Sequence, residues 1–407
     1  MHPAQRFRKL IRKFTYIFPF FIYSISWEQR KVGELLIERN EQSPMNIEYP
    51  LMAFIANEGV APKGERYDRS SLVTDTENKL YKRTEFGDFI YSSNNLETGS
   101  IGLNKYGKAC ISPVYSIFQP TGITDSDFLG RRLVRKDFIN AMVKWRQGVI
   151  YGQWTIHESD FLKIEISVPS VKEQRKIGAY LDELDNLITL HQRKYDKLLS
   201  IKKSMLEKMF PRDGSKFPEI RFSGFTDPWE QRKLGHVFVE YSEKGHPELP
   251  ALTIIQGGGT VRRDESERSL QYDKASLVNY KMVNAEDFIV HLRSFEGGLE
   301  KATTLGIISP AYHTFHGEGT DSRFYYSYFR SKRFIEQDLK PHVYGIRDGR
   351  SIDIEGMKTI EIPWTSYTEQ QVIGNYIDTM DNLITLHQRK LEKLKNIKKS
   401  MLEKMFV

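Results

Sequence analysis

The chain has 407 residues, of which 39% are hydrophobic and 28% charged; this composition excludes a disordered chain and predicts two or more domains. The net charge of +7 and the pI of about 9.1 favour a polyanionic partner, either nucleic acid or an anionic membrane surface. Cys110 is the one cysteine, which excludes an intramolecular disulfide, predicts a reducing setting and leaves no zinc-type cluster in the sequence.

The first 26 residues differ in character from the rest. Several basic residues precede an apolar run from Phe14 to Ile25, an order that resembles a signal peptide. The run is too short to span a bilayer and contains Pro19. The alternative is an unusual or mis-started N-terminus. We favour it because the remaining sequence has an intracellular composition, and we expect a cytoplasmic protein without a membrane partner.

Two long segments of the chain repeat each other. Residues 173–210 read EQRKIGAYLDELDNLITLHQRKYDKLLSIKKSMLEKMF, and residues 369–406 read EQQVIGNYIDTMDNLITLHQRKLEKLKNIKKSMLEKMF. WEQRKVG at Trp27 likewise returns as WEQRKLG at Trp229. Internal repetition of this kind predicts a duplicated architecture.

Shorter repeats lie in the segments between these. The matching pairs are GDFIYSS at Gly87 with EDFIVHL at Glu286, ISPVY at Ile111 with ISPAY at Ile308, and FLKIEISVPS at Phe161 with MKTIEIPWTS at Met357. The segments diverge elsewhere, which fits one scaffold that carries two different recognition surfaces. Plain duplication followed by drift explains the repeat equally well, although it does not explain why the helical parts stay alike while the globular parts differ.

The long repeats have the heptad pattern of a coiled coil. Apolar residues recur every seven positions in two interleaved sets, with one histidine and one lysine in each seam. The predicted seam residues are Ile177, Leu181, Leu184, Ile188, Leu198, Ile373, Ile377, Ile384 and Leu394. Further apolar side chains flank this seam, and either the globular segments or a partner protein covers them.

The direction of the helices follows from their length. Each would be about 57 Å long, whereas a domain of the size of the second globular segment has a radius of gyration of about 15 Å. Antiparallel pairing brings that domain's two attachment points together. We therefore predict an α+β protein with two globular α/β domains alternating with two long helices that pair as an antiparallel coiled coil. The predicted parts are 1–26, an atypical segment; 27–170, the first globular domain; 171–212, a central helical spacer; 213–366, the second globular domain; and 367–407, a C-terminal helical spacer.

Two observations bear on whether the chain has a metal site or a catalytic site. His191 and His387 occupy equivalent seam positions, where a packed or register-setting pair is the favoured interpretation and a metal site the alternative. We assign no metal site. A methyltransferase Pro-Pro-aromatic motif, a P-loop, a nuclease motif and a catalytic triad are all missing from the sequence. We therefore expect no catalytic residues.

These patterns together resemble the DNA specificity subunit of type I restriction-modification systems. The resemblance rests on the WEQRK motifs at Trp27 and Trp229, on SGFTDPWEQRKLG from Ser223, and on the EQxxIxxxLDxLDxLITLHQRK helices, in the same order along the chain. It covers nearly all residues after Ser26. In relatives a segment such as PEIRFSGFTD precedes the first WEQRK motif, as it does from Pro218 before the second one here, and residues 1–26 depart from this pattern.

The resemblance implies a non-catalytic subunit of a DNA adenine methyltransferase and endonuclease complex. Each globular domain, called a target recognition domain, would read one half of a split site in double-stranded DNA, and the helices would set the spacing between the halves. Two methyltransferase subunits and two restriction subunits would be the partners. Those partners, and not this chain, would bind S-adenosylmethionine, ATP and magnesium.

Candidate DNA contacts are basic and amide side chains in polar stretches between apolar strand-like runs. Lysine and arginine bind phosphates, arginine reads guanine, and asparagine or glutamine reads adenine. For the first domain we predict Lys79, Lys82, Arg83, Asn94, Asn95, Asn104, Lys105, Lys108, Arg146 and Gln153. For the second we predict Gln256, Arg262, Arg263, Arg268, Arg293, Tyr344, Arg347 and Arg350. For any single residue the alternative is an ordinary solvated surface side chain.

Two other classes of function are compatible with the sequence. One is a coiled-coil interaction or structural protein whose globular domains bind proteins. The other is an enzyme with an unrecognised site. The target bases and the length of the unread gap do not follow from the sequence.

Overall fold

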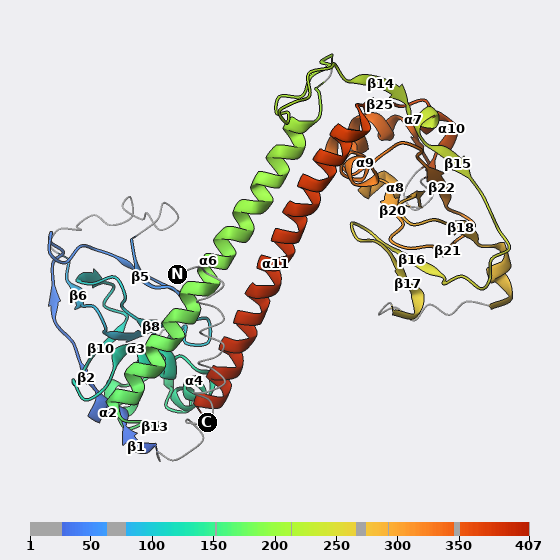
Figure 1. Ribbon diagram of the computed structural model, residues 1–407. Helices are drawn as coiled ribbons and strands as arrows, with labels where there is room; N and C mark the ends of the chain where they lie inside the picture. The colour runs from blue at the N-terminus through green and yellow to red at the C-terminus, as the bar shows by residue number, and fades with distance from the viewer. Residues whose placement is uncertain are drawn as a thin grey trace. The chain divides into compact units, whose positions relative to one another are not determined.

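The computed structural model describes residues 27–62, 79–150, 153–212, 214–265, 274–291, 293–345 and 351–406, so the predicted segment 1–26 lies outside the described residues. The chain divides into two units: unit 1 is residues 1–187 with 396–407, and unit 2 is residues 188–395. Each unit therefore contains a globular head and parts of two long helices, α6 (Val171–Met209) and α11 (Tyr367–Met405), drawn in green and red in Figure 1. We call the globular parts head 1 and head 2.

Head 1 is built from short, mostly antiparallel strands. A four-stranded sheet has the order β2-β10-β7-β8, and a three-stranded sheet has the order β3-β6-β9. Three strand pairs, β1-β13, β4-β5 and β11-β12, complete it. The strands are β1 (Glu28–Lys31), β2 (Leu36–Glu38), β3 (Gln42–Ser43), β4 (Ala53–Ile55), β5 (Gly59–Ala61), β6 (Tyr81–Thr84), β7 (Phe89–Tyr91), β8 (Ile101–Leu103), β9 (Ala109–Ile111), β10 (Ser116–Pro120), β11 (Gln147–Ile150), β12 (Gln153–Thr155) and β13 (Glu165–Val168). The short helices are α2 (Val32–Leu35), α3 (Ser126–Leu133), α4 (Lys136–Val143) and α5 (Glu158–Phe161).

Head 2 repeats the order of the four-stranded sheet, and a two-stranded pair takes the place of the three-stranded sheet. Its four-stranded sheet is β15-β22-β19-β20, and its strand pairs are β14-β25, β16-β17, β18-β21 and β23-β24. The strands are β14 (Glu230–Lys233), β15 (Val239–Tyr241), β16 (Leu252–Ile255), β17 (Gly259–Arg262), β18 (Lys281–Val283), β19 (Phe288–Val290), β20 (Glu300–Lys301), β21 (Gly306–Ile308), β22 (His313–His316), β23 (Val343–Tyr344), β24 (Ser351–Ile352) and β25 (Glu361–Trp364). The helices are α7 (Leu234–Val237), α8 (Ser294–Gly297), α9 (Ser322–Phe329) and α10 (Ile354–Lys358), with 3-10 helices η3 (Arg263–Glu265), η4 (Lys274–Asn279) and η6 (Lys340–His342) and a π-helix η5 (Phe334–Leu339).

The short sequence repeats fall on matching strands of the two heads. Ile111 ends β9 and Ile308 ends β21, and in both the following Ser-Pro enters a turn that the tyrosine three residues after the serine closes by a backbone hydrogen bond. The repeat of GDFIYSS and EDFIVHL lies on β7 and β19. The repeat of FLKIEISVPS and MKTIEIPWTS lies on β13 and β25. The repeat in the sequence therefore reflects one strand arrangement used twice, and the predicted α+β class is confirmed.

Aromatic side chains fill the centre of each head. In head 1, Phe89, Tyr91, Phe118 and Phe161 are fully buried, with ring centroids between 4.6 and 5.9 Å apart. These residues lie on β7, β10 and α5, so their contacts hold the four-stranded sheet against a helix. Fully buried aromatic rings are large contributors to stability, and those near 5 Å apart gain further from edge and offset contacts.

The long helices begin with the same local signal. Ser170 precedes α6 and Ser366 precedes α11, and each hydroxyl accepts the backbone N–H of the glutamate three residues on. α6 ends at Met209, just before Pro211, which lacks the N–H that a helix requires.

Seven of the nine predicted seam residues are buried, and Ile188 and Leu198 are half-buried. Within unit 2, His191 lies against His387 and Lys202 against Asp381, so the two helix segments of that unit run in opposite directions. Within unit 1, Lys398 contacts Asp185 at 2.5 Å, the same distance as the Lys202–Asp381 pair. Lys202 and Lys398 are equivalent residues of the long repeat, and so are Asp185 and Asp381.

Candidate nucleic-acid interface

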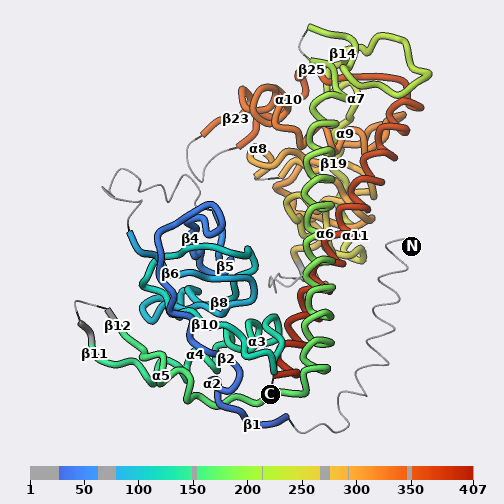
Figure 2. The backbone as a smooth tube through the Cα atoms, turned by 90° about the vertical axis from the view of Figure 1, so that its left-hand side faces the viewer, coloured from blue at the N-terminus to red at the C-terminus, as the bar shows by residue number. Residues whose placement is uncertain are grey.

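Head 1 presents a β-hairpin that is tied to the segment after β7. The hairpin is β11-β12, and the segment is residues 92–98. The Asn94 side-chain oxygen accepts the Trp154 N–H at 2.6 Å, and the Ser93 hydroxyl accepts the Ile156 N–H at 3.1 Å. We call the hairpin, this segment and the adjacent Trp145–Arg146 the unit 1 hairpin patch; the hairpin lies at the edge of head 1 in Figure 2.

Arg146 anchors the unit 1 hairpin patch. Its two terminal nitrogens bind the two oxygens of Glu97 at 2.8 and 2.7 Å, and one also binds the Ser93 carbonyl at 3.0 Å. The guanidinium lies 5.9 Å from the Trp154 ring centroid and lowers the pKa of Glu97 below its ordinary value. A bidentate pair of this kind fixes geometry, so Arg146 positions the patch. Its direct contact with DNA stays a prediction.

The exposed residues of this patch are aromatic and amide side chains. Trp154 is 44% exposed, Trp145 is 39% exposed, and Asn95 is exposed. Gln153 belongs to β12, but the position of its side chain lies outside what the structure describes. Exposed aromatic rings next to amides provide a surface on which bases stack and against which base edges form hydrogen bonds.

Head 2 has an equivalent patch. Hairpin β23-β24 carries Tyr344, which is 59% exposed, and β24 lies against α8 in the segment after β19. Arg293 is exposed in that segment, and its backbone N–H donates to Nδ1 of His291 at 3.2 Å. Burial and the neighbouring arginines lower the pKa of His291 to about 4, so its ring is neutral. We call this the unit 2 hairpin patch; Arg347 and Arg350 lie outside the described residues.

A second group of predicted residues in head 1 surrounds Tyr49. The Arg83 guanidinium lies 4.7 Å and the Lys108 ammonium 5.5 Å from the Tyr49 ring centroid. Arg83 donates to the Ser43 hydroxyl, and Lys108 pairs with Glu48. Of the two lysines on or beside β6, Lys79 is exposed and lies 5.9 Å from the Tyr81 ring, whereas Lys82 is only 8% exposed. These cations lie on β6 and next to β9, apart in sequence from the unit 1 hairpin patch.

The predicted DNA contact of Asn104 does not hold. Asn104 is fully buried, its amide nitrogen donates to the Thr84 hydroxyl and the Gly107 carbonyl, and its oxygen accepts two backbone N–H groups of the following turn. Asparagine ahead of a glycine-containing turn commonly folds back in this way, and that signal was present in Asn104–Gly107. The adjacent Lys105 is exposed and pairs with Asp127 at 2.8 Å.

The predicted residues of head 2 outside its hairpin patch lie on or next to hairpin β16-β17. Gln256 is exposed in the turn of this hairpin. Arg262 forms two hydrogen bonds with Asp264, and Arg263 donates to the Tyr280 hydroxyl at 3.3 Å. Arg268 lies outside the described residues.

Glu300 positions part of the candidate interface in head 2, and the sequence did not reveal this role. It is fully buried and accepts the backbone N–H groups of Gly257 and Gly259 at 2.7 and 3.1 Å, and it also binds Tyr326 and Arg330. It therefore fixes the turn that carries Gln256. The strand registers place Gly102 of head 1 at the position of Glu300, so the repeat gave no indication of this role.

In both units, one glutamine and one arginine attach the head to its long helix. The Gln370 side-chain oxygen accepts the Asp321 N–H at 3.0 Å, and the Gln174 oxygen accepts the Asp125 N–H at 2.9 Å. Asp321 and Asp125 are the N-caps of α9 and α3. The EQ motif of the repeat thus links the start of a long helix to the start of a head helix.

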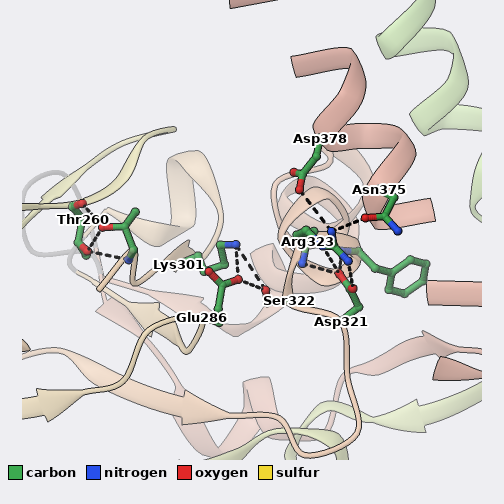
Figure 3. A network of polar contacts seen from close by, with 10 residues as sticks. Thr260, Glu286, Lys301, Asp321, Ser322, Arg323, Asn375 and Asp378 are labelled. Atoms are coloured by element: carbon green, nitrogen blue, oxygen red, sulfur yellow. Dashed lines mark hydrogen bonds and ion pairs between the residues drawn. The ribbon is translucent and has the colours of Figure 1, made fainter. Parts of the chain in front are cut away.

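The arginines of these junctions come from different positions. In unit 2, Arg323 binds Asp321, donates to Asn375 at 2.6 Å and lies 3.6 Å from Asp378 of α11, as Figure 3 shows. In unit 1, Arg131 of α3 binds Asp127 on its own helix and Asp182 and Asp185 on α6. Both arrangements restrict how a head tilts against its helix.

Two negative findings apply to the described residues only. They contain no group of three or more histidine, cysteine or acidic side chains arranged to hold a metal ion. Among them, no helix has the length and apolar character that crossing a membrane demands.

Residues 25–200 match the family model described as the type I restriction modification DNA specificity domain. The type I restriction enzyme MjaVIII specificity subunit of Methanocaldococcus jannaschii is 22% identical over 404 residues, which cover 92% of this chain and 91% of that protein. By these two matches the chain is similar to the specificity subunits of type I restriction-modification systems. The resemblance noted in the sequence is thus confirmed.

Solved specificity subunits have a similar fold. The type I S subunit from M. genitalium aligns with a TM-score of 0.50 at 13% identity, over 95% of this chain and 97% of that one. The HsdS subunit from Thermoanaerobacter tengcongensis aligns with a TM-score of 0.45 at 17% identity, over 94% and 97%. At these identities the first comparison supports the fold of this chain and not its individual contacts.

Proposed function

We propose that this chain is a specificity subunit that reads a bipartite site in double-stranded DNA, one half with each head, and directs partner methyltransferase and restriction subunits to it. One observation carries the proposal: the two heads share the order of their four-stranded sheets, while the residues exposed on their hairpin patches differ. Head 1 exposes Trp154 and Asn95, whereas head 2 exposes Tyr344 and Arg293. Two heads that have the same scaffold but different contact residues can read two half-sites of different sequence.

The long helices support a fixed spacing between the half-sites. The Asp185–Lys398 pair of unit 1 and the Asp381–Lys202 pair of unit 2 join equivalent positions of the repeat, and His191 meets its own counterpart, His387. We infer that α6 and α11 pair as an antiparallel coiled coil between the two target recognition domains. Half-sites read on one face of B-DNA lie about 34 Å apart, a separation that helices of this length can hold.

The helices also provide a surface for partner subunits. Leu190, Leu199, Ile201, Leu383 and Leu386 of unit 2 are 37–44% exposed. Apolar side chains gathered on one helical segment mark an interaction surface more often than isolated ones do. We assign this surface to the methyltransferase subunits, two per chain, with two restriction subunits completing the nuclease.

We propose that the chain itself catalyses no reaction and acts in the cytoplasm. S-adenosylmethionine, ATP and magnesium would bind to the partners. Assay of the isolated chain for DNA methylation and cleavage tests this directly, because either activity would contradict a purely recognising role.

The main test combines co-purification with methylome sequencing. The chain should bring down a methyltransferase in two copies, and removing its gene should abolish methylation at one bipartite motif in the host genome. If the purified complex has no preference among DNA sequences, the proposal fails. The remaining candidate would then be an interaction protein whose heads bind other proteins.

A further inference from the structure

Hairpin β4-β5 of head 1 and hairpin β16-β17 of head 2 end in turns of the same conformation. Ile55 pairs with Gly59, and Ile255 pairs with Gly259. In each turn the residue before the glycine donates its backbone N–H to the isoleucine carbonyl, at 3.0 and 2.9 Å. Both glycines have a positive φ, and a Cβ atom on either would lie 2.6 or 2.7 Å from a carbonyl oxygen of β8 or β20. The fold therefore fixes the base of both turns in the same way.

The tips of the two turns differ in sequence. Head 1 has Ala-Asn-Glu at residues 56–58, and head 2 has Gln-Gly-Gly at residues 256–258; all of these residues are exposed. Asn57 and Gly257 both have a positive φ, which asparagine and glycine tolerate. Gln256 does not have a positive φ, so the backbone gives no reason for a glutamine there.

A side-chain amide lies at the same place in both heads. The Asn57 amide lies over Gly99, where a Cβ atom would be 2.6 Å from Nδ2, and the Gln256 amide lies over Gly297, where a Cβ atom would be 2.9 Å from Cδ. Gly99 and Gly297 are equivalent, because each lies three residues before the matched positions of β8 and β20. The heads thus bring an amide to one location from neighbouring turn positions, since the longer glutamine side chain compensates for the shift of one residue.

Both amides are available to a ligand. Neither side chain forms a hydrogen bond with any residue that the structure describes, whereas the amides of Asn104 and Gln174 are used within the fold. Both also adjoin the hairpin patches. Gly99, whose carbonyl accepts the Asn57 N–H at 3.0 Å, follows the 92–98 segment of the unit 1 hairpin patch, and Gly297 ends α8, against which β24 lies.

We propose that Asn57 and Gln256 are specificity-determining residues, and that each reads an adenine of one half-site. A side-chain amide can donate to N6 and accept from N7 neither alone nor in part but through one bidentate contact with the adenine edge. The inference rests on the proposed reading of one half-site by each head, and it adds the residue and the base. Asn57 was not among the DNA contacts predicted from the sequence.

Exchanging the tip of head 1 tests the role of the amide without changing the turn. The complex of the full chain with its methyltransferase is assayed for binding to duplexes in which each base pair of the methylated motif is replaced in turn. Asn57→Gly suits the positive φ and should lower the penalty for replacing one A·T base pair of one half-site roughly tenfold. Ala56→Gln combined with Asn57→Gly reproduces the Gln-Gly tip of head 2 and should restore the penalty.

Two substitutions in head 2 provide the matched test. Gln256→Ala should have the same effect in the other half-site only. Gly297→Ala should have it without removing the amide, because the new Cβ atom would displace the end of the Gln256 side chain. Gln256 is exposed, so neither substitution should change the melting temperature of the chain by more than a small amount.

The outcomes separate this inference from the proposed function. If the wild-type complex discriminates among the duplexes, but Asn57→Gly and Gln256→Ala retain full discrimination at every base pair, the inference is refuted and the proposed function stands. If the double substitution in head 1 does not restore the lost discrimination, the asparagine acts through the turn and not through its amide, which also refutes the inference. A wild-type complex without any sequence preference would refute both.

Discussion

His191 and His387 face each other across the two long helices, with their Nδ1 atoms 2.8 Å apart. At this distance one Nδ1 must donate a hydrogen bond and the other accept it, so at least the accepting ring is neutral. A zinc ion between them would hold each nitrogen about 2.0–2.1 Å away and spread the nitrogens to roughly 3.3 Å. The pair therefore fits the register-setting polar contact favoured from the sequence.

This pair makes the helices sensitive to acid. Burial, the opposing ring, and Lys390 and Lys194 lower the pKa of His191 to about 4, and burial lowers that of His387 too. An unfolded histidine titrates near 6.5, so between about pH 6.5 and 4 the unfolded chain binds more protons than the folded one. Stability should therefore fall as the pH drops through this window.

Thermal unfolding of the wild type and of the His191→Leu, His387→Leu double variant, measured from pH 7.5 to 4.5, checks this. Leucine retains the seam packing and removes both titrating groups, so the variant should lose less stability over the window. Equal losses in the two proteins would show that the histidine pair is not the origin of the pH dependence.

Arg131→Ala should destabilise unit 1. The arginine is 14% exposed and binds Asp127, Asp182 and Asp185, so its removal leaves three carboxylates without their shared cation. We expect a loss of about 2–4 kcal/mol in the free energy of unfolding, measured by urea denaturation. Arg30→Ala is the matched control, because Arg30 forms exposed pairs with Glu28 and Glu34 and its loss should be much smaller.

Gly374→Ala should also destabilise the protein, although alanine favours a helix over glycine by about 1 kcal/mol. A Cβ atom at Gly374 would lie 2.6 Å from Oδ1 of Asp321 and 3.2 Å from the Arg323 side chain, at the junction of head 2 with α11. We expect a net loss of about 1–3 kcal/mol. Gly178→Ala is the comparison: its Cβ would lie 3.2 Å from Asp127, so the effect should be smaller, and a larger one would contradict the steric argument.

The repeats predicted much of this fold because strands and helices leave regular apolar patterns. The matching runs around Ile111 and Ile308 lie on β9 and β21, and the long heptad segments form α6 and α11. Such elements follow from local periodicity and turn residues, which a single sequence contains.

The candidate site was harder to predict because it depends on contacts between distant segments. The sequence did not show that Arg146 pairs with Glu97 or that Asn104 is enclosed by its own turn. Glu300 fixes a turn of head 2 from a position where head 1 has Gly102, and Arg131 attaches head 1 to α6, whereas Arg323 has this role in unit 2 from another position. The repeat therefore could not identify them.

Trp154→Ala and Tyr344→Ala should each weaken recognition of one half-site only. Loss of a contact to a base edge in a duplex costs about 1–3 kcal/mol, so affinity for the cognate duplex should fall roughly tenfold. Both side chains are exposed, and neither change should alter the melting temperature by more than a small amount. Binding to duplexes with one half-site scrambled distinguishes the two variants, since each should lose discrimination at its own half-site. A variant that relaxes both half-sites equally would contradict the assignment of one head to each half.

The spacing role of the helices can be tested by lengthening them. One heptad inserted after His191 in α6, and one before His387 in α11, leaves the Asp185–Lys398 and Lys202–Asp381 pairs each within its own unit. Seven residues add about 10 Å, or roughly three base pairs of B-DNA, and turn a straight helix by only about 20° from its starting orientation.

The methylated motif of this lengthened variant should therefore keep both half-sites and widen its unread gap by about three base pairs. Over that distance the duplex turns by roughly 100°, which the helices do not follow, so the efficiency of methylation should fall even at the new spacing. Sequencing the methylome of cells that express the variant measures both effects. Insertion of a heptad into α6 alone is the control, because it removes the register of the two helices and should abolish methylation. An unchanged gap in the double insertion would mean that the helices do not set the spacing, since their length would then have no influence on which bases go unread.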